Sequence, residues 1–364
     1  MKKSLGYAND RSVFNALNQS KITGKKIQEL FLRKGILCSV STDREELAAY
    51  FSRLTHDYID HKLIADNIGI IPRREKITSM EITNNTGSYF SHDNIKFKLK
   101  DLEKHLTDIG CIATYKTLSD EQELEITYTE IDYSKSDFQQ MITRNGKISI
   151  SIDGSAIHIR STQAKFINEV KEKLVSEIIS IDKDNLTKNV ITLRGLDSPT
   201  LRTKFLLETI NNIKDYKLEE ITQVGIFKNM ELLDDIEDDD DKEEIIANIN
   251  DAHLKGNDVH LTSELKLLSE KGFYYVKIIA TLKGEKDNLL YTVDIEFKDK
   301  ENCDLFSYIV KHVNEPKYDI ETKMLSSYKS PRAPKPSEQI FFINNLEKSA
   351  KLTLSMIEND ASNT

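Results

Sequence analysis

The spacing of apolar residues changes near residue 77, and this change limits the folds open to the chain. Between residues 22 and 68, apolar side chains recur three or four positions apart, as in helices that bury one face. Beyond Ile77, several segments alternate apolar and polar residues, as strands do. The clearest hairpin signal is Asp153-Gly154, a tight-turn pair between alternating runs at 147–152 and 156–160. The sequence therefore predicts an α+β protein.

Breaks between these segments divide the chain into four expected parts. A small all-helical head occupies 1–76 and ends in the basic string Pro72-Arg73-Arg74-Glu75-Lys76. A body with mixed, mainly antiparallel sheet and packed helices follows at 77–230. Residues 231–330 are expected to be an acidic loop and a β-rich subdomain, because 231–244 hold ten acidic groups that repel one another. Residues 331–364 form a proline spacer and a C-terminal helix, whose apolar stripe consists of Phe342, Leu346, Ala350, Leu354 and Ile357.

Charge is distributed unevenly between the head and the rest of the chain. Residues 1–76 contain 14 Lys/Arg and 9 Asp/Glu, whereas the remaining 288 residues contain 37 and 51. The net charge is therefore +5 on the head and −14 elsewhere. An acidic body repels a polyanion, so any nucleic-acid contact is expected on the head.

Two segments of the head have the pattern of a known module. Residues 24–36 form an apolar, lysine-rich helix that ends at Gly35, and residues 41–51 begin a second helix with polar capping residues. This pattern resembles the SAP-like helix–extended-loop–helix family, whose members commonly bind DNA backbones and in some cases bind proteins. The resemblance covers about 35 residues. It implies a DNA- or protein-binding head, although Thr42-Asp43-Arg44 replaces the family's glycine-lysine pair.

Positive side chains occur along the expected head helices and in the string that follows them. Nucleic acid bound through about four to six of them would show a log–log salt slope of about −4 to −5. The alternative is a solvated helical surface or a protein-docking domain. The residues predicted to bind nucleic acid are Lys25, Lys26, Arg33, Lys34, Arg44, Arg53, Arg73, Arg74 and Lys76.

The string from His56 to His61 contains two pairs of metal-binding residue types at helical spacing. His56 and Asp60 are four residues apart, as are Asp57 and His61, so each pair is adjacent on a helix. A catalytic metal site needs a third protein ligand from elsewhere, and the spacing identifies none. An ordinary helix start is the favoured interpretation, and no metal is expected here.

An alternative function rests on Asp294, Glu296 and Lys298. Glu-x-Lys on a strand resembles the restriction-endonuclease fold, in which carboxylates hold Mg²⁺ and the lysine orients the attacking water. That family also needs an acidic residue on the preceding strand, and only Glu285 and Asp287, in an expected turn, are available. Alternating charged and apolar residues on a half-exposed strand produce the same pattern without catalysis.

Other motifs of enzymes and membrane proteins are missing from the sequence. It contains no phosphate-binding loop, dinucleotide fingerprint or nucleophile elbow, and no apolar run long enough to span a bilayer. Three widely spaced cysteines predict reduced thiols in the cytoplasm. We therefore expect a non-catalytic protein without cofactors that binds DNA and assembles with a protein partner or with itself, as in bacterial phage defence or mobile-element control. The remaining alternative is a pure protein-interaction scaffold.

Overall fold

The computed structural model describes residues 9–20, 22–68, 74–118, 121–134, 138, 140–180, 182–228, 251–319, 321–322 and 324–362. It contains two compact units: residues 1–74 with 91–149, and residues 75–90 with 150–364. The predicted α+β class is confirmed, since helices and mainly antiparallel strands make up the chain. The acidic run 231–244 and Arg73 lie outside the described residues.

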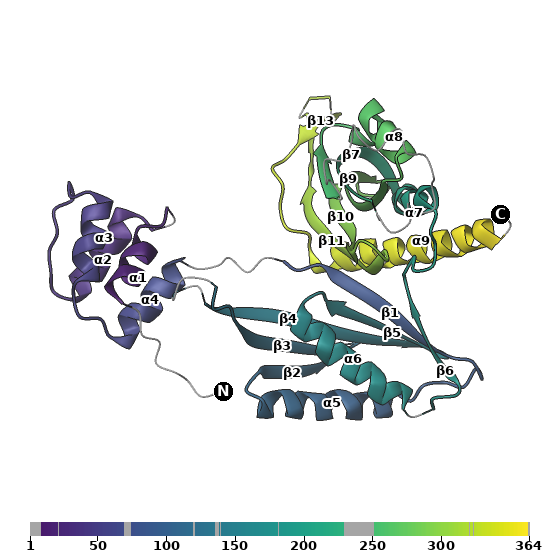
Figure 1. The fold of residues 1–364 in the computed structure, drawn as a ribbon, viewed down its shortest axis with the longest axis horizontal. Coiled ribbons are helices and arrows are strands. Elements are labelled where there is room, and N and C mark those ends of the chain that lie inside the picture. Colours follow the sequence, from purple (N-terminus) through teal and green to yellow (C-terminus); the bar gives the residue numbers. More distant parts are fainter. Residues whose placement is uncertain are drawn as a thin grey trace, which may run out of the picture. The chain divides into compact units, whose positions relative to one another are not determined.

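The head is a small bundle of helices (Figure 1). Its elements are α1 (Asp10–Leu17), α2 (Gly24–Arg33), α3 (Arg44–Ser52) and α4 (Tyr58–Ile68). The three helices expected from residue 23 onward are confirmed, whereas α1 was not expected. The bundle buries an apolar core that includes Val13, Leu17, Ile27, Phe31, Phe51 and Ile64.

An extended loop joins α2 to α3 and returns along α2. Gly35 ends α2 with φ of +73°, a left-handed conformation that glycine adopts without strain. The Gln28 side chain then donates a hydrogen bond to the Ser39 carbonyl at 3.2 Å, which holds the loop beside the helix. At the end of the loop, Asp43 caps α3 by accepting from the Glu45 backbone N–H at 2.9 Å. The expected order of helix, extended loop and helix is therefore present.

The rest of the first unit combines one helix with part of the sheet. Its elements are α5 (His92–Asp108), β2 (Ile112–Thr117), β3 (Glu121–Ile131) and β4 (Met141–Asp153), with the strands in the order β2-β3-β4. Leu99, Leu102 and Leu106 of α5 are buried. Among the described strands, β2 lies at the end of the sheet and pairs with β3 alone, and its Tyr115 N–H donates to a Glu103 carboxylate oxygen of α5 at 2.9 Å.

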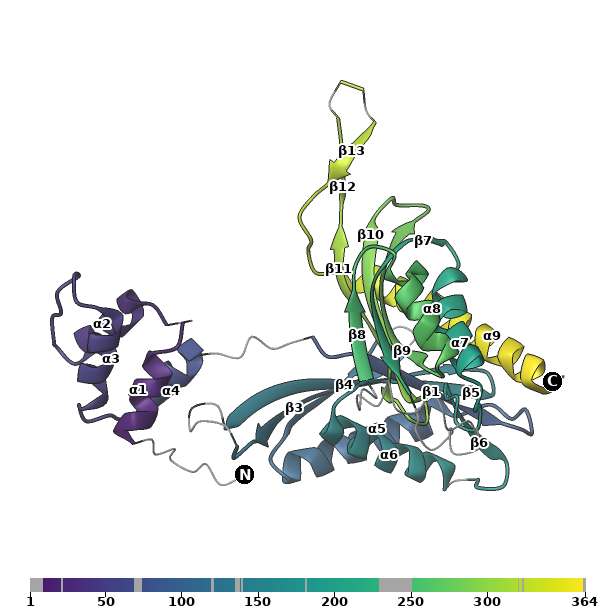
Figure 2. The ribbon, with the colours of Figure 1, turned by 45° about the horizontal axis from the view of Figure 1, so that its top comes forward.

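The second unit is built on an antiparallel sheet with the strand order β5-β1-β11-β10-β9-β7-β8, and β6 also pairs with β1. The strands are β1 (Ile77–Asn84), β5 (Ala156–Thr162), β6 (Leu186–Val190), β7 (Tyr216–Phe227), β8 (Asp251–Lys255), β9 (Tyr274–Gly284), β10 (Leu290–Asp299) and β11 (Asp304–Asn314). A two-stranded hairpin of β12 (Pro316–Tyr318) and β13 (Leu325–Tyr328) projects beyond β11 (Figure 2). Within the part of the chain expected to be rich in strands, β9, β10 and β11 are each ten or eleven residues long.

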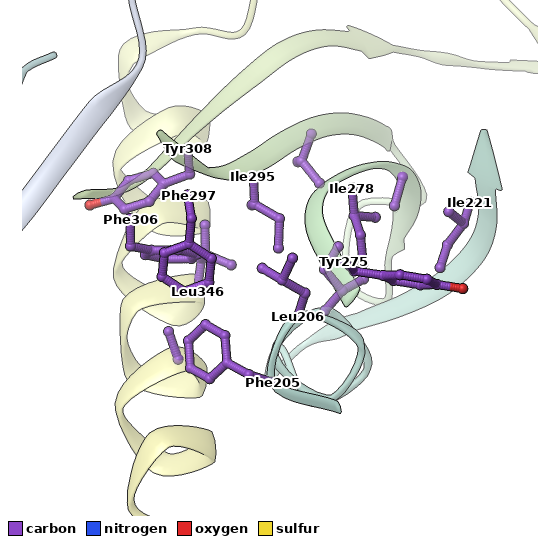
Figure 3. Packing of buried hydrophobic residues seen from close by; sticks show 14 of the residues in the cluster. Phe205, Leu206, Ile221, Tyr275, Ile278, Ile295, Phe297, Phe306, Tyr308 and Leu346 are labelled. Atoms are coloured by element: carbon purple, nitrogen blue, oxygen red, sulfur yellow. The ribbon is translucent and has the colours of Figure 1, made fainter. Parts of the chain in front are cut away.

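Helices of the second unit pack on two parts of its sheet: the first contacts β5, and the later ones contribute to an apolar cluster with β9, β10 and β11. The helices are α6 (Lys165–Ile179), α7 (Pro199–Asn211), the 3₁₀ turn η3 (Val259–Leu261), α8 (Ser263–Glu270) and α9 (Pro336–Ser362). Phe205 of α7 and Leu346 of α9 meet Phe297 and Phe306 of the sheet in one apolar cluster (Figure 3). The C-terminal helix therefore packs on this unit through its predicted stripe, of which Leu354 alone is only partly buried.

We expect Phe297→Ala to destabilise the second unit by about 3–5 kcal/mol, because the ring is fully buried between α7 and the sheet and its removal leaves a cavity. Hydrogen exchange of β9 and β10 amides measures this loss. The control is Leu352→Ala at an exposed position of α9, which should cost less than about 0.5 kcal/mol. Equal protection in the two variants would contradict the assigned core.

Candidate functional site

The structure leaves four of the predicted nucleic-acid-binding residues available on the head surface. Lys25, Arg33 and Arg53 are exposed and Lys26 is partly exposed. Within the described part of the head, none of the four forms an ion pair. They are therefore free to meet a negatively charged ligand.

Lys34 instead has a structural role. Its ammonium lies 2.6 Å from an Asp60 carboxylate oxygen and 2.6 Å from the Thr55 carbonyl. These contacts join the end of α2 to the start of α4. Burial alone would raise the pKa of Asp60, but hydrogen bonds from Lys34 and from the Asp57 backbone together with the nearby positive charge hold it below its ordinary value.

Arg44 is also occupied inside the head. Its guanidinium donates to the Gln19 carbonyl at 2.7 Å, to the Ile22 carbonyl at 3.4 Å and to the Asn18 side chain at 3.2 Å. These acceptors lie between α1 and α2, so Arg44 holds the start of α3 beside the start of α2. A side chain used in this way cannot also reach a phosphate without releasing its partners.

The positive charge of the head also lies partly outside its helices. Residues 9–68 contain nine Lys/Arg and eight Asp/Glu, so most of the excess comes from the flanking segments. Arg74 is exposed, and Arg73 falls outside the described residues. Lys76 belongs to the second unit, where it joins a cluster of charges. Of the predicted residues, Lys34 and Arg44 are therefore bonded within the head, and Lys76 is bonded within the second unit.

Lys76, Lys277, Asp294 and Glu296 form a four-charge cluster on the sheet of the second unit. Lys76 contacts Asp294 and lies 2.9 Å from Glu296, and Lys277 lies 3.2 Å from each carboxylate. Strand pairing causes this arrangement, since Lys277 of β9 is opposite Glu296 of β10 and Lys76 directly precedes β1. The sequence motif identified the two carboxylates, but the lysines that meet them come from β9 and from the position before β1.

Glycine at position 225 makes room for this cluster. Gly225 of β7 is opposite both Lys277 and His253 in the sheet. A Cβ atom at position 225 would lie 2.9 Å from the Cβ of Lys277 and 3.0 Å from the His253 ring. A side chain there would therefore crowd the base of Lys277 and the His253 ring.

Burial and ion pairing have opposite effects on the pKa values of Lys76, Lys277 and Glu296. Burial lowers the pKa of Lys76 more than the two carboxylates raise it. At Lys277 burial also lowers the pKa, but the carboxylates prevail and the pKa is raised. Burial raises the pKa of Glu296, but its two lysine neighbours outweigh this effect and the pKa is lowered. Two positive and two negative groups thus neutralise one another.

This pairing argues against the Mg²⁺ site of the nuclease alternative. Each carboxylate that would bind the metal is already bonded to two ammonium groups. Lys298 is exposed on the same strand and is not part of the cluster. Glu285 and Asp287 lie in the turn between β9 and β10, where Asp287 accepts from the Tyr291 hydroxyl at 2.7 Å. The structure thus assigns Asp294 and Glu296 to ion pairs within the sheet.

The His56–His61 string is a helix start. The Asp60 N–H donates to the Asp57 carboxylate at 2.8 Å and the Asp57 N–H donates to Asp60 at 3.2 Å, which is a capping-box pattern. The His56 ring packs 5.0 Å from the Phe51 ring, and burial lowers its pKa. Across the residues that the structure describes, no group of three or more His, Cys, Asp or Glu side chains could hold a metal ion.

The sequence was compared with protein-family profiles and with curated proteins. No family profile matches the chain, and no curated protein matches it either. Among the described helices, none combines the length and the apolar character that crossing a bilayer requires. The SAP-like resemblance of the head therefore stays a prediction.

We expect Lys34→Met to lower the free energy of unfolding of the head by about 2–3 kcal/mol at neutral pH, because it leaves the buried Asp60 carboxylate without its charged donor. The Asp60 pKa is lowered in the folded head, so the contribution is present above the unfolded value near pH 4 and is lost as the pH falls below it. Hydrogen exchange of α2 and α4 amides measures the difference. An equal cost at neutral pH and at about pH 2 would contradict this role, and exposed Lys25→Met is the control.

We expect Glu296→Gln to destabilise the second unit by about 1–2 kcal/mol, because two ammonium groups then share one carboxylate. Millimolar Mg²⁺ should leave the melting temperature of both forms unchanged. The matched control is the exposed Lys298→Met, which should be nearly neutral. A rise in melting temperature with Mg²⁺ that Glu296→Gln removes would instead support the nuclease site.

Proposed function

We propose that this chain binds DNA through the phosphate backbone, with the first turn of α2 as the main contact. The observation that carries this proposal is the composition of that turn, where Gly24, Lys25 and Lys26 follow the capping residue Thr23 without any acidic group. The N-terminus of a helix carries a partial positive charge, which acidic residues usually offset. Two lysines add to that charge instead.

A bound anion would neutralise the positive charge at the first turn of α2. Backbone N–H groups at a helix start and two nearby ammonium groups all favour a bound phosphate oxygen. The Thr23 hydroxyl already accepts from the Lys26 N–H at 3.4 Å, so the turn keeps its helical shape without a ligand. Lys25 and Lys26 thus add charge to a turn that the chain has already formed.

Arg33 and Arg53 would supply further contacts because both are exposed and form no ion pair within the described head. The start of α3 is less favourable for phosphate binding, because Glu45 and Glu46 occupy its first turn. With four available side chains, the expected log–log salt slope is about −3 to −4. This slope is less steep than the one expected if Lys34 and Arg44 also bound phosphate. The acidic remainder of the chain favours contact through the head alone.

A salt titration of DNA binding tests the proposal. We expect Lys25→Ala/Lys26→Ala to weaken binding at low salt and to reduce the steepness of the log–log plot by about two, because two phosphate contacts are lost. Fluorescence anisotropy with a labelled duplex of arbitrary sequence measures both quantities. Circular dichroism would show that the variant is folded.

The matched control is Lys165→Ala/Lys173→Ala, which removes two exposed lysines from α6 of the second unit. It should leave the affinity and the slope unchanged. The same slope in both double variants, or no salt-sensitive binding by the unmodified chain, would refute the proposal.

A further inference from the structure

Strand β1 joins two parts of the second unit, which we call the smaller lobe (β1, β5, β6 and α6) and the larger lobe (β7 to β11 with α7, α8 and α9). Within the smaller lobe, β1 pairs with β5 along residues 77–83 and with β6 along residues 80–84. Across the joint, the described pairing of β1 with β11 is the single pair of Ile77 and Tyr308. The sheet hydrogen bonds that connect the two lobes are therefore few, and side-chain contacts must fix the angle between them.

Helix α9 supplies such contacts. It belongs to the larger lobe, where Phe342 and Leu346 are buried in the apolar cluster. From another face of the helix, Glu347 accepts from the Arg160 guanidinium of β5 at 2.9 and 2.6 Å and also from the Tyr308 hydroxyl of β11.

A second ion pair lies one turn further along α9. Lys351 of α9 contacts the Glu81 carboxylate of β1. We call the two pairs, Arg160 with Glu347 and Lys351 with Glu81, the α9 latch. Each pair joins a residue of the smaller lobe to a residue of the larger lobe, so the latch closes the joint.

The latch is not backed by close apolar packing. A cavity of about 260 Å³ lies between α9 and the β1–β6 pair, where it separates Leu354 of the helix from Val190 and Ile191. Protein interiors are normally packed without gaps of this size. The polar contacts of the latch therefore carry much of the attachment of α9 to the smaller lobe.

His158 of β5 belongs to the same group of charges. Its ring lies 3.1 Å from the Glu81 carboxylate that also pairs with Lys351. While the ring is neutral, the two cations of the latch match its two carboxylates. Protonation adds a third cation. The charged groups that face the ring are Glu81 of β1, Arg160 of β5, and Glu347 and Lys351 of α9, and Glu358 lines the adjoining cavity.

The surroundings of His158 disfavour its charged form. Burial is the largest cause that lowers its pKa, and the positive charges of Lys351 and Arg160 act in the same direction against the carboxylates. A ring released into water has a pKa near 6.5, so it takes up a proton more readily than the ring in the closed latch. The closed latch is therefore fully favoured above about pH 6.5 and loses stability as the pH falls below that value.

We propose that the α9 latch is a pH-sensitive switch, which opens the joint between the two lobes in mild acid when His158 takes up a proton. The start of β1 is the pivot, because Lys76 is held there by Asp294 and Glu296 of the larger lobe. This switch lies in the second unit and does not depend on DNA binding by the head.

Single-molecule fluorescence energy transfer within the full chain tests the switch. One dye is attached at Lys173→Cys on α6 and the other at Lys266→Cys on α8, both exposed positions, after Cys38→Ser and Cys111→Ser. We expect one transfer efficiency at pH 7.5 and a second, open population that grows by about threefold or more at pH 5.5. His158→Gln should abolish this growth because glutamine stays neutral at both pH values.

Arg160→Met should give the open population at pH 7.5 as well, because it breaks the latch directly. The matched control is Lys204→Met, which breaks the 2.8 Å ion pair of α7 with Asp360 inside the larger lobe and should behave like the unmodified chain. Lys351→Met, at the more exposed pair, provides the same test if circular dichroism shows that Arg160→Met is unfolded.

Three outcomes would overturn the proposal. The first is a transfer efficiency that changes neither with pH nor in the folded latch variant, which would mean that the lobes are rigidly joined. The second is an equal acid response in His158→Gln, which would assign the response to another group. The third is an open population in Lys204→Met equal to that of the latch variant, which would mean that loss of any ion pair loosens this unit.

Discussion

The alternation of side chains along β9, β10 and β11 decides which residues meet in the second unit. Ile278, Ile295 and Tyr308 are opposite one another in the pairing and point into the apolar cluster with α7 and α9. Their neighbours in sequence must then lie on the other face of the sheet. Lys277 and Glu296 reach each other for this reason, so burial on one face creates the charge cluster on the other.

The charges of the cluster neutralise one another within the sheet. The cluster is therefore a set of ion pairs, whereas its sequence motif had suggested a Mg²⁺ site as an alternative. Carboxylates two residues apart on a strand are typical of both metal sites and ordinary half-exposed strands. The deciding information is the identity of the facing residues. Lys277 is separated from Glu296 by a turn, whereas Lys76 is separated by 218 residues from Asp294, and no local pattern connects such distant positions.

Long regular segments were predictable because their patterns repeat many times. The strands β9, β10 and β11 and the apolar stripe of α9 follow directly from alternation and helical spacing. Helix α1 lacks such repetition, since only Val13, Ala16 and Leu17 of its eight residues are buried. In the head, exposure of cations could not be predicted either. Lys34 and Arg44 look like Lys25 and Arg33 in the sequence, and only tertiary partners distinguish a structural cation from an available one.

The hydrogen bond from the Tyr115 N–H to Glu103 has a consequence for the behaviour of the protein at high concentration. Strands at the end of a sheet offer free backbone groups to which another chain can add, and this is a common route to aggregation. By occupying the outward N–H in the middle of β2, the glutamate of α5 interrupts the pattern that an incoming strand would need. The helix thus protects the sheet edge while leaving it solvent-accessible.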